Sequence, residues 1–483
     1  MKALWTSEEI ASACHGAISG TWDVDGICID SRTVALGDLF IALKGPTYDG
    51  HDFFVEALER GASAAMVTRI PKSAEQLVNS ERLVIVEDTY RELATLANAS
   101  RARTEAQVCA VTGSVGKTTT KEALALTLGR QGLVHSTIGN LNNHVGAPLS
   151  VARMPKNTDF GVFELGMSHA GELTPLSRLV RPHVAVITAI EAVHMEFFES
   201  IADIANAKAE IFAGLQSNGT AILPADSPHY ERLSEVAKAS GAKTVVGFGS
   251  HKRAAYRLTD WSITETGTYV SADIDGRHIA YEIGLRGEHM ALNSLAVLAA
   301  VTALGGNADK AANDLSHMTP LKGRGCINLV NLPTGSFVLI DESYNASPIS
   351  ITALVSTLSA TPRTGRLILA LGDMLELGQD TNTLHSDLAI PIESGGIDLV
   401  LTTGSNMAHL NRVLSTNVEK YHTANSEALA DLIISVVRAG DIVAVKGSLG
   451  SCMNVVVNAL NGLATANNNN VPDNGLEMER TAQ

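Results

Sequence analysis

One short segment constrains the fold of this chain more than any other: a glycine loop between an apolar run and a helical pattern. The apolar run covers residues 108–111, and residues 121–126 have the apolar spacing of a helix. Between them lie Thr112, Gly113, Ser114, Val115, Gly116, Lys117, Thr118 and Thr119. A strand, a glycine loop and a helix in this order form a phosphate-binding loop, so the sequence predicts a nucleotide site on an α/β domain.

The chemistry of this loop follows from its residue types. Gly113 and Gly116 let backbone N–H groups turn toward phosphate oxygens, and the following helix adds its positive N-terminal end. Lys117 would reach the β- and γ-phosphates, and the Thr118 hydroxyl would bind Mg²⁺. The general pattern has a further glycine where this chain has Val111. The alternative, a glycine turn with a solvated lysine, is disfavoured by the strand-to-helix context.

Composition excludes several classes of protein. The 483 residues suffice for two or three domains, and 51 acidic against 36 basic side chains give a net charge of -15. This balance argues against binding to nucleic acid or to an anionic membrane. We see no signal peptide and no apolar stretch long enough to span a bilayer. Five scattered cysteines, an odd number, indicate reduced thiols in a cytoplasmic protein.

The alternation of apolar patterns predicts three α/β domains. Residues 1–103 form a small mixed α/β unit, and residues 104–320 form a central parallel sheet with helices on both faces and a hairpin at Asp275-Gly276. Residues 321–462 indicate a second doubly wound, Rossmann-like sheet. Residues 463–483 are polar and rich in asparagine, so we expect a disordered tail.

Several polar residues fall near the predicted phosphate site. Glu164 ends a predicted strand, a suitable place for a Mg²⁺ ligand, and His194 follows the next strand. A lone histidine is more often structural, and by its residue pattern alone Lys208 is a surface lysine of a helix. The pair Asn142 and Asn143 suits a heterocycle or a sugar as well as it suits a simple turn.

Taken in order, these segments resemble the Mur ligases, the ATP-dependent amide ligases of peptidoglycan precursor assembly. The resemblance extends to about residue 460. Within the family, the loop at residues 341–348 lacks the Asp-Asn-Pro-Arg signature of the diamino-acid-adding enzyme and is similar to that of the branch that adds D-alanyl-D-alanine to UDP-N-acetylmuramoyl-tripeptide. The resemblance implies a first domain for the UDP substrate, a central ATP domain and a C-terminal ligase domain.

The resemblance also implies a set of site residues. Lys117, His194, Lys208 and Arg324 would be catalytic, with Lys208 carbamylated by CO₂. The Mg²⁺ ligands would be Thr118, Glu164 and His194. ATP would contact residues 113–119 together with Asn293, Arg324, Asp341, Tyr344 and Asn345. The UDP substrate would contact Ser31, Arg32, Asp49, His51, Asn142 and Asn143.

The implied reaction has two steps, through an acyl phosphate that the dipeptide amine then attacks. The base that deprotonates this amine is not identified, and His385 is a candidate by family position only. Met290 and Leu449 depart from the family pattern, which weakens a polar contact at 290 and an anion contact at 449. We expect a monomer. A folylpolyglutamate synthase-like ligase and a catalytically silent nucleotide switch are the alternatives, and the third residue of the peptide, diaminopimelate or lysine, stays open.

Overall fold

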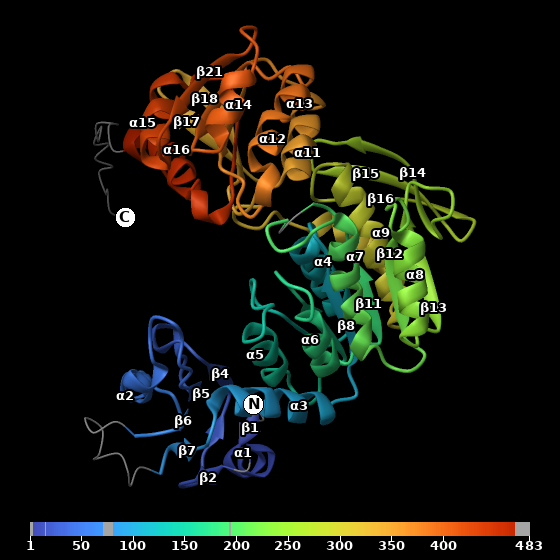
Figure 1. Ribbon diagram of the computed structural model, residues 1–483, viewed down its shortest axis with the longest axis vertical. Coiled ribbons are helices and arrows are strands. Elements are labelled where there is room, and N and C mark those ends of the chain that lie inside the picture. The colour runs from blue at the N-terminus through green and yellow to red at the C-terminus, as the bar shows by residue number, and fades with distance from the viewer. Residues whose placement is uncertain (1–2, 15, 71–80, 193–194, 469–483) are drawn as a thin grey trace, which may run out of the picture.

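The structure is a computed structural model that describes residues 3–14, 16–70, 81–192 and 195–468. It confirms three α/β domains in chain order, with the N-terminal and C-terminal domains at opposite ends of the central one (Figure 1). The expected boundary at residue 103 falls between a helix and a strand. The expected boundary at residue 320 falls just ahead of a strand. In the described part of the chain, no helix is long and apolar enough to cross a membrane.

The N-terminal domain is a five-stranded sheet in the order β2-β7-β6-β5-β4, parallel except at β2, beside a two-stranded sheet of β1 and β3. Its strands are β1 (Trp5–Thr6), β2 (Ala17–Ile18), β3 (Asp23–Val24), β4 (Gly26–Cys28), β5 (Asp38–Ile41), β6 (Ala64–Val67) and β7 (Leu83–Ile85). Its helices are α1 (Ser7–Cys14), α2 (Phe54–Glu59) and α3 (Thr89–Ala102). Asp88 caps α3 by accepting from the N–H groups of Tyr90 and Arg91.

The central domain holds a nine-stranded sheet in the order β16-β15-β14-β13-β12-β11-β8-β10-β9, parallel from β9 to β14 and antiparallel through β15 and β16. Its strands are β8 (Gln107–Thr112), β9 (Val134–Ser136), β10 (Phe160–Glu164), β11 (Val184–Ile187), β12 (Thr220–Pro224), β13 (Thr244–Gly249), β14 (Tyr256–Ile263), β15 (Thr268–Ile274) and β16 (Arg277–Ile283). Its helices are α4 (Lys117–Gly129), α5 (Gly146–Ala152), α6 (Leu173–Val180), α7 (Ile201–Ala209), α8 (Tyr230–Ala239), α9 (Glu288–Ala303) and α10 (Ala308–Asp314).

The apolar run before the phosphate loop is buried on both faces of this sheet. Val108 and Ala110 of β8 belong to the apolar cluster under α5, α6 and α7, whereas Cys109 and Val111 belong to the cluster under α4 and α9. A central parallel strand therefore needs an uninterrupted apolar sequence, because successive side chains point to opposite faces. The hairpin between β15 and β16 turns at Asp275 and Gly276, both with positive φ, as the sequence predicts.

The C-terminal domain is a six-stranded sheet in the order β17-β18-β22-β19-β20-β21, with β17 the antiparallel edge strand. Its strands are β17 (Cys326–Leu332), β18 (Gly335–Glu342), β19 (Leu367–Gly372), β20 (Leu399–Thr403), β21 (Glu419–Thr423) and β22 (Ile442–Lys446). Its helices are α11 (Pro348–Ser359), α12 (Thr381–Ser386), α13 (Ala389–Ser394), α14 (Met407–Val413), α15 (Ser426–Val436) and α16 (Asn454–Asn468).

The end of the chain corrects one expectation. Helix α16 continues to Asn468, so residues 463–468 are helical rather than part of a disordered tail. Val456 and Leu460 are buried, and Leu463 packs against the same apolar cluster, which extends the helix past the expected boundary at 462. Residues 469–483 lie outside the described residues.

Candidate active site

The phosphate loop has the shape that its two glycines require. Gly113 has φ 151° and Gly116 has φ 84°. A β-carbon at Gly113 would lie 2.0 Å from the Thr188 hydroxyl, and one at Gly116 would lie 2.7 Å from the Asn293 amide nitrogen. Both positions therefore exclude a side chain by space as well as by backbone conformation. The expected nucleotide residue Asn293, in α9, lies directly against the loop.

Lys117 opens helix α4 and its ammonium stays within the loop. Its Nζ donates to the Gly113 carbonyl at 2.7 Å and to the Ser114 carbonyl at 3.3 Å. Burial lowers the pKa of Lys117, the Glu164 carboxylate opposes this shift, and the Arg324 guanidinium adds to it. The structure thus brings Lys117, Glu164 and Arg324 into one electrostatic environment, although Arg324 comes from the start of the C-terminal domain.

Glu164 has the geometry of a cation ligand. It is 1% exposed at the end of β10, and its Oε1 accepts from the Asn142 amide at 2.7 Å. Its Oε2 is buried and has no hydrogen-bond partner among the described residues. A buried, unsatisfied carboxylate oxygen calls for a bound cation or its equivalent. Thr118, buried in the first turn of α4, is the second expected ligand, and His194 lies outside the described residues.

Lys208 is buried, which corrects the surface position that its residue pattern alone indicates. It is 2% exposed in α7, where Ala205, Ala207 and Ala209 leave room for close packing. Within the described part of the chain its ammonium has no hydrogen bond or ion pair. Burial, and secondarily the charge of Lys117, lower the pKa of Lys208 well below the usual value. The structure therefore favours a neutral amine close to the phosphate loop.

A cavity of about 880 Å³ separates the central and C-terminal domains. The central domain lines it with Val115, Gly116, Met290 and Asn293, and the C-terminal domain with Arg324, Ile349 and Lys446. The Arg324 guanidinium carbon lies 4.0 Å from the centroid of the Tyr344 ring, which holds the side chain by a cation–π contact. The volume is that of a pocket for a nucleotide-sized ligand.

Asp341 holds the neighbouring turn with both carboxylate oxygens. Its Oδ1 accepts from the Ser343 N–H at 3.1 Å and from the Ser343 hydroxyl at 2.6 Å, and its Oδ2 accepts from the Gly323 N–H at 3.1 Å. Asn345 is likewise engaged within its loop, because its Oδ1 accepts from the Ala346 N–H at 2.9 Å. Their contacts with a nucleotide stay predictions, and in this structure Asp341 fixes the turn that carries Arg324.

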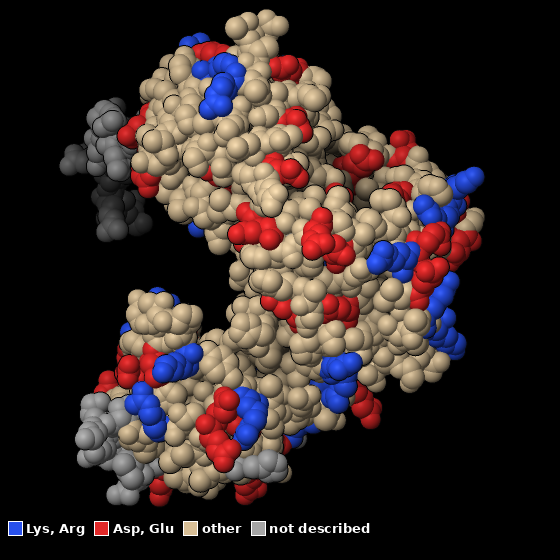
Figure 2. Space-filling model, viewed as in Figure 1, with Lys and Arg blue, Asp and Glu red and all other residues tan. Residues whose placement is uncertain are grey.

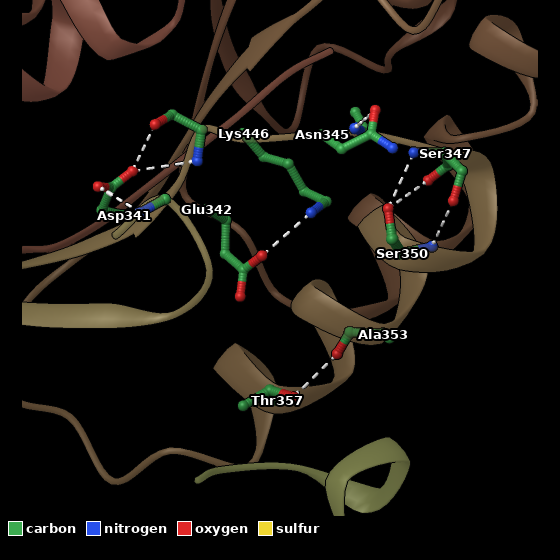
Figure 3. Close-up of polar contacts among 11 residues, drawn as sticks. Asp341, Glu342, Asn345, Ser347, Ser350, Ala353, Thr357 and Lys446 are labelled. Carbon is green, nitrogen blue, oxygen red and sulfur yellow. Dashed lines mark hydrogen bonds and ion pairs between the residues drawn. The ribbon is translucent and has the colours of Figure 1, made fainter. Parts of the chain in front are cut away.

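Glu342 and Lys446 line the cavity instead, and neither was among the predicted site residues. Lys446 Nζ donates to Glu342 Oε2 at 3.1 Å, and Figure 3 shows the two side chains pointing toward one another beside helix α11. Neighbouring residues of a strand point to opposite sides, so an inward Asp341 at the end of β18 implies a Glu342 that faces the other way. That alternation is the signal that could have identified Glu342.

The expected UDP-substrate residues of the N-terminal domain lie apart from this cavity, which none of them lines. Arg32 is exposed and forms two hydrogen bonds with the Asp30 carboxylate, at 2.9 and 2.7 Å, while the Ser31 hydroxyl lies 3.5 Å from Glu56. Figure 2 shows a deep hollow between the N-terminal and C-terminal domains, with the central domain at its base. A substrate that contacts both these N-terminal residues and the cavity between the other two domains would span this hollow.

His51 and Asn143 have roles within the protein itself. His51 is 4% exposed, with Nδ1 2.6 Å from Asp49 Oδ1 and with Nε2 accepting from the Thr68 N–H at 2.9 Å. Asn143 Oδ1 accepts from the Gly146 N–H at 2.8 Å at the start of α5, whereas Asn142 holds Glu164. The structure therefore places Asn142 beside the expected metal ligand, and its contact with the substrate stays a prediction.

His385 is not available as a base, which corrects its candidacy. The side chain is fully buried, its Nε2 accepts from the Met374 N–H at 3.1 Å, and its Nδ1 donates to the Thr381 carbonyl at 2.6 Å. Burial lowers the pKa of His385. Protonation would break the first of these hydrogen bonds, so the residue positions the loop at 374–381.

Comparison with known proteins identifies the family of this chain. The chain matches family models described as the Mur ligase catalytic domain over residues 23–101, the Mur ligase middle domain over 111–301, and the Mur ligase glutamate ligase domain over 328–449. It is 36% identical to a UDP-N-acetylmuramoyl-tripeptide–D-alanyl-D-alanine ligase of Bacillus subtilis, over 90% of this chain and 93% of that protein.

Two solved structures have the same arrangement of domains. MurF from Acinetobacter baumannii is 27% identical with a TM-score of 0.82, over 95% of this chain and 99% of that one. The MurF ligase of Thermotoga maritima in complex with ADP is 28% identical with a TM-score of 0.76, over 92% and 98%. With the phosphate loop, the buried lysine and the interdomain cavity in place, this chain belongs to the Mur ligase family.

Proposed function

We propose that this protein joins D-alanyl-D-alanine to UDP-N-acetylmuramoyl-tripeptide in the cytoplasm, with the conversion of ATP to ADP and phosphate. The observation that carries the proposal is that all three domains, and not the ATP site alone, match a ligase with that name at 36% identity. A folylpolyglutamate synthase-like ligase would share the ATP chemistry but not the N-terminal domain for a UDP substrate. A nucleotide switch without catalytic activity would not require two buried ionisable side chains, Glu164 and Lys208.

ATP binds in the interdomain cavity with its phosphates on residues 113–119. Lys117 lies on one side of the phosphates and Arg324, from the other domain, lies on the opposite side. Thr118 and Glu164 would hold Mg²⁺, and Oε2 of Glu164, which has no partner among the described residues, fits that role. His194, the third expected ligand, lies outside the described residues. A cation held there would supply positive charge against the phosphates, which an anionic nucleophile requires.

The reaction proceeds in two steps. The terminal carboxylate of the UDP-tripeptide attacks the γ-phosphorus of ATP, the bond to the bridging oxygen breaks, and ADP leaves. The uncharged amine of D-alanyl-D-alanine then attacks the acyl phosphate carbonyl, phosphate leaves, the nitrogen loses one proton, and the amide bond forms. Lys117 and Arg324 stabilise the negative charge that accumulates in both steps. All the residues named belong to one chain, so a monomer suffices.

Lys208 is carbamylated in the active enzyme. Burial lowers the pKa of Lys208, and CO₂ reacts with the uncharged form of an amine. The nitrogen forms a bond to the carbon of CO₂ and one proton is released, which converts the side chain into an anion. The positive charge of Lys117, which disfavours a protonated Lys208, would favour such an anion.

Carbamylation can be observed directly. Wild-type protein in ¹³C-bicarbonate should show a carbamate carbon resonance that Lys208→Ala lacks. The variant should lose at least about 100-fold in kcat, and acetate or formate should restore part of it. A wild-type spectrum without a carbamate resonance would contradict the modification, while leaving the ligase activity itself open to measurement.

One assay tests the function as a whole. Phosphate release from ATP should require both the UDP-tripeptide and D-alanyl-D-alanine. Release in the presence of a folate and glutamate would support the alternative ligase, and no release with any acceptor would support the silent switch. Tripeptides with diaminopimelate and with lysine at the third position should be compared, because the described residues do not distinguish them.

A further inference from the structure

A second lysine of helix α4 is buried, and the reaction described above does not use it. Lys121 is fully buried, one helical turn after Lys117. Its Nζ donates to the Thr137 carbonyl at 2.8 Å and is paired with the carboxylate of Glu122, a side chain that is 36% exposed. Burial of an ammonium group is costly, and a methionine would fill similar space without that cost. The charge and the donors of Lys121 therefore need a reason.

The partner of Lys121 leads directly to Glu164. Thr137 is 1% exposed, its N–H donates to the Val162 carbonyl at 3.0 Å, and its hydroxyl accepts from the Glu164 N–H at 3.2 Å. The segment that begins at Thr137 ends at Asn142, whose amide donates to Glu164 Oε1 at 2.7 Å. Both the backbone and the side chain of Glu164 are therefore held by the segment that Lys121 anchors.

The far end of the segment is equally constrained. The Gly166 N–H donates to the Asn142 carbonyl at 2.9 Å, and a β-carbon at Gly166 would lie 2.7 Å from Asn142 Oδ1. With Oε1 of Glu164 engaged by Asn142, the oxygen left without a partner among the described residues is Oε2. The segment 137–142 thus selects which carboxylate oxygen is available to a cation.

We propose that Lys121 is a positioning residue that couples the phosphate loop to Glu164. Helix α4 carries Lys117 and Thr118 at its first turn and Lys121 at its second. By fixing Thr137, Lys121 fixes the segment that holds Glu164 relative to the helix that holds the phosphates. The inference rests on the proposed function in one respect, that the cation at Glu164 is the one that accompanies the nucleotide.

The test separates the cation from the nucleotide. ADP binding to the full chain is measured by calorimetry, once with Mg²⁺ and once with EDTA. Lys121→Met should reduce the Mg²⁺-dependent gain in ADP affinity by about 10-fold or more, the usual effect of removing a residue that supports a metal ligand. ADP affinity in EDTA should change less than about threefold, because the phosphate loop itself is intact.

Matched variants keep the proposal open to contradiction. Thr137→Val, which removes the hydroxyl that accepts from Glu164, should reduce the Mg²⁺-dependent gain, and Thr137→Ser should preserve it. Lys252→Met, at an exposed site, is the control for loss of a lysine. If Lys121→Met does not fold, Lys121→Gln is measured in its place, because Thr137→Val keeps the carbonyl that Lys121 binds and tests only the hydroxyl contact with Glu164.

The outcomes also separate this proposal from the proposed function. Equal losses with and without Mg²⁺, or an unchanged gain in both variants, would overturn the coupling. Wild-type protein that binds no ADP would instead contradict the proposed function.

Discussion

The two junctions of the central domain differ in how they are built. At the N-terminal junction, one apolar cluster continues from Trp5 and Leu39 of the first domain to Phe163 and Ile204 of the second. The apolar clusters of the C-terminal domain consist only of its own residues, from 330 to 464. The cavity lies between the central and C-terminal domains, where such a shared cluster is absent from the described residues.

Hydrogen bonds repeat this contrast. Trp5 Nε1 donates to the Ala152 carbonyl at 3.0 Å, Arg101 Nε to the Val180 carbonyl at 2.8 Å, and Arg153 Nε to the Ile27 carbonyl at 2.6 Å, all across the first junction. A junction with a continuous core moves as one body, whereas a junction around a cavity allows one domain to shift against the other. The first two domains therefore share one core, whereas the C-terminal domain meets the central domain around a cavity.

The largest effect is expected at the cavity, from Lys117→Ala. Ligation should be abolished, with a loss of at least about 10³-fold in kcat, because the variant lacks the ammonium group that stabilises negative charge on the phosphates. The thermal midpoint should stay close to that of the wild type, since among the described residues the Lys117 ammonium donates to carbonyls of its own loop. Phosphate release and thermal unfolding are measured on the same sample. A folded variant with substantial activity would contradict the assignment.

The next largest effect is expected at the N-terminal junction, on stability. Trp5→Ala removes a side chain that is 2% exposed and shared between two domains, and should lower the free energy of unfolding by about 3–5 kcal/mol. Ile349→Ala, at the wall of the cavity with 42% exposure, should change it by less than about 1 kcal/mol. Urea unfolding followed by circular dichroism measures both. Equal losses would remove the distinction between the two junctions.

A smaller effect is expected in the UDP domain, on substrate affinity alone. Arg32→Ala should weaken binding of the UDP-tripeptide by about 1–3 kcal/mol, the contribution of a charge-assisted hydrogen bond, and Ser31→Ala should act in the same direction. The KM for ATP should stay nearly constant, because neither residue lines the cavity. Steady-state kinetics against each substrate provide the measurement. A parallel rise in the KM for ATP would place the two residues elsewhere.

The smallest effect is expected on the pH dependence of stability, when Asp49 is protonated in acid. Burial alone would raise the pKa of Asp49, but hydrogen bonds from His51 and Arg69 lower it to about 2. A carboxyl whose pKa is lower in the folded state stabilises the fold above its unfolded pKa of about 4, and this stabilisation is lost as the pH falls toward 2. Asp49→Asn should therefore flatten the decrease in the thermal midpoint between pH 4 and pH 2. An unchanged pH profile would show that the Asp49 contacts do not stabilise the domain.

The sequence analysis succeeded where a pattern is local. The phosphate loop, the strand that ends at Glu164 and the hairpin at Asp275 each depend on neighbouring residues, whose spacing predicts the element directly. It missed the edge strand β17, in which Ile327 and Leu329 are exposed and the alternation of polar and apolar residues is weak. It also placed the end of the last helix too early, because the packing of α16 against α15 and β17 is not visible in its own residues.

The sequence by itself determined the α/β class, the order of the three domains and the residue types of the ATP site, because each of these follows from short-range periodicity and from motifs. Tertiary structure decided the rest. Whether Lys208 is buried, whether His385 has a free nitrogen and how Glu342 is paired depend on what packs around each side chain in the folded protein. Burial and orientation of a side chain are properties of what packs around it, and no local pattern encodes that.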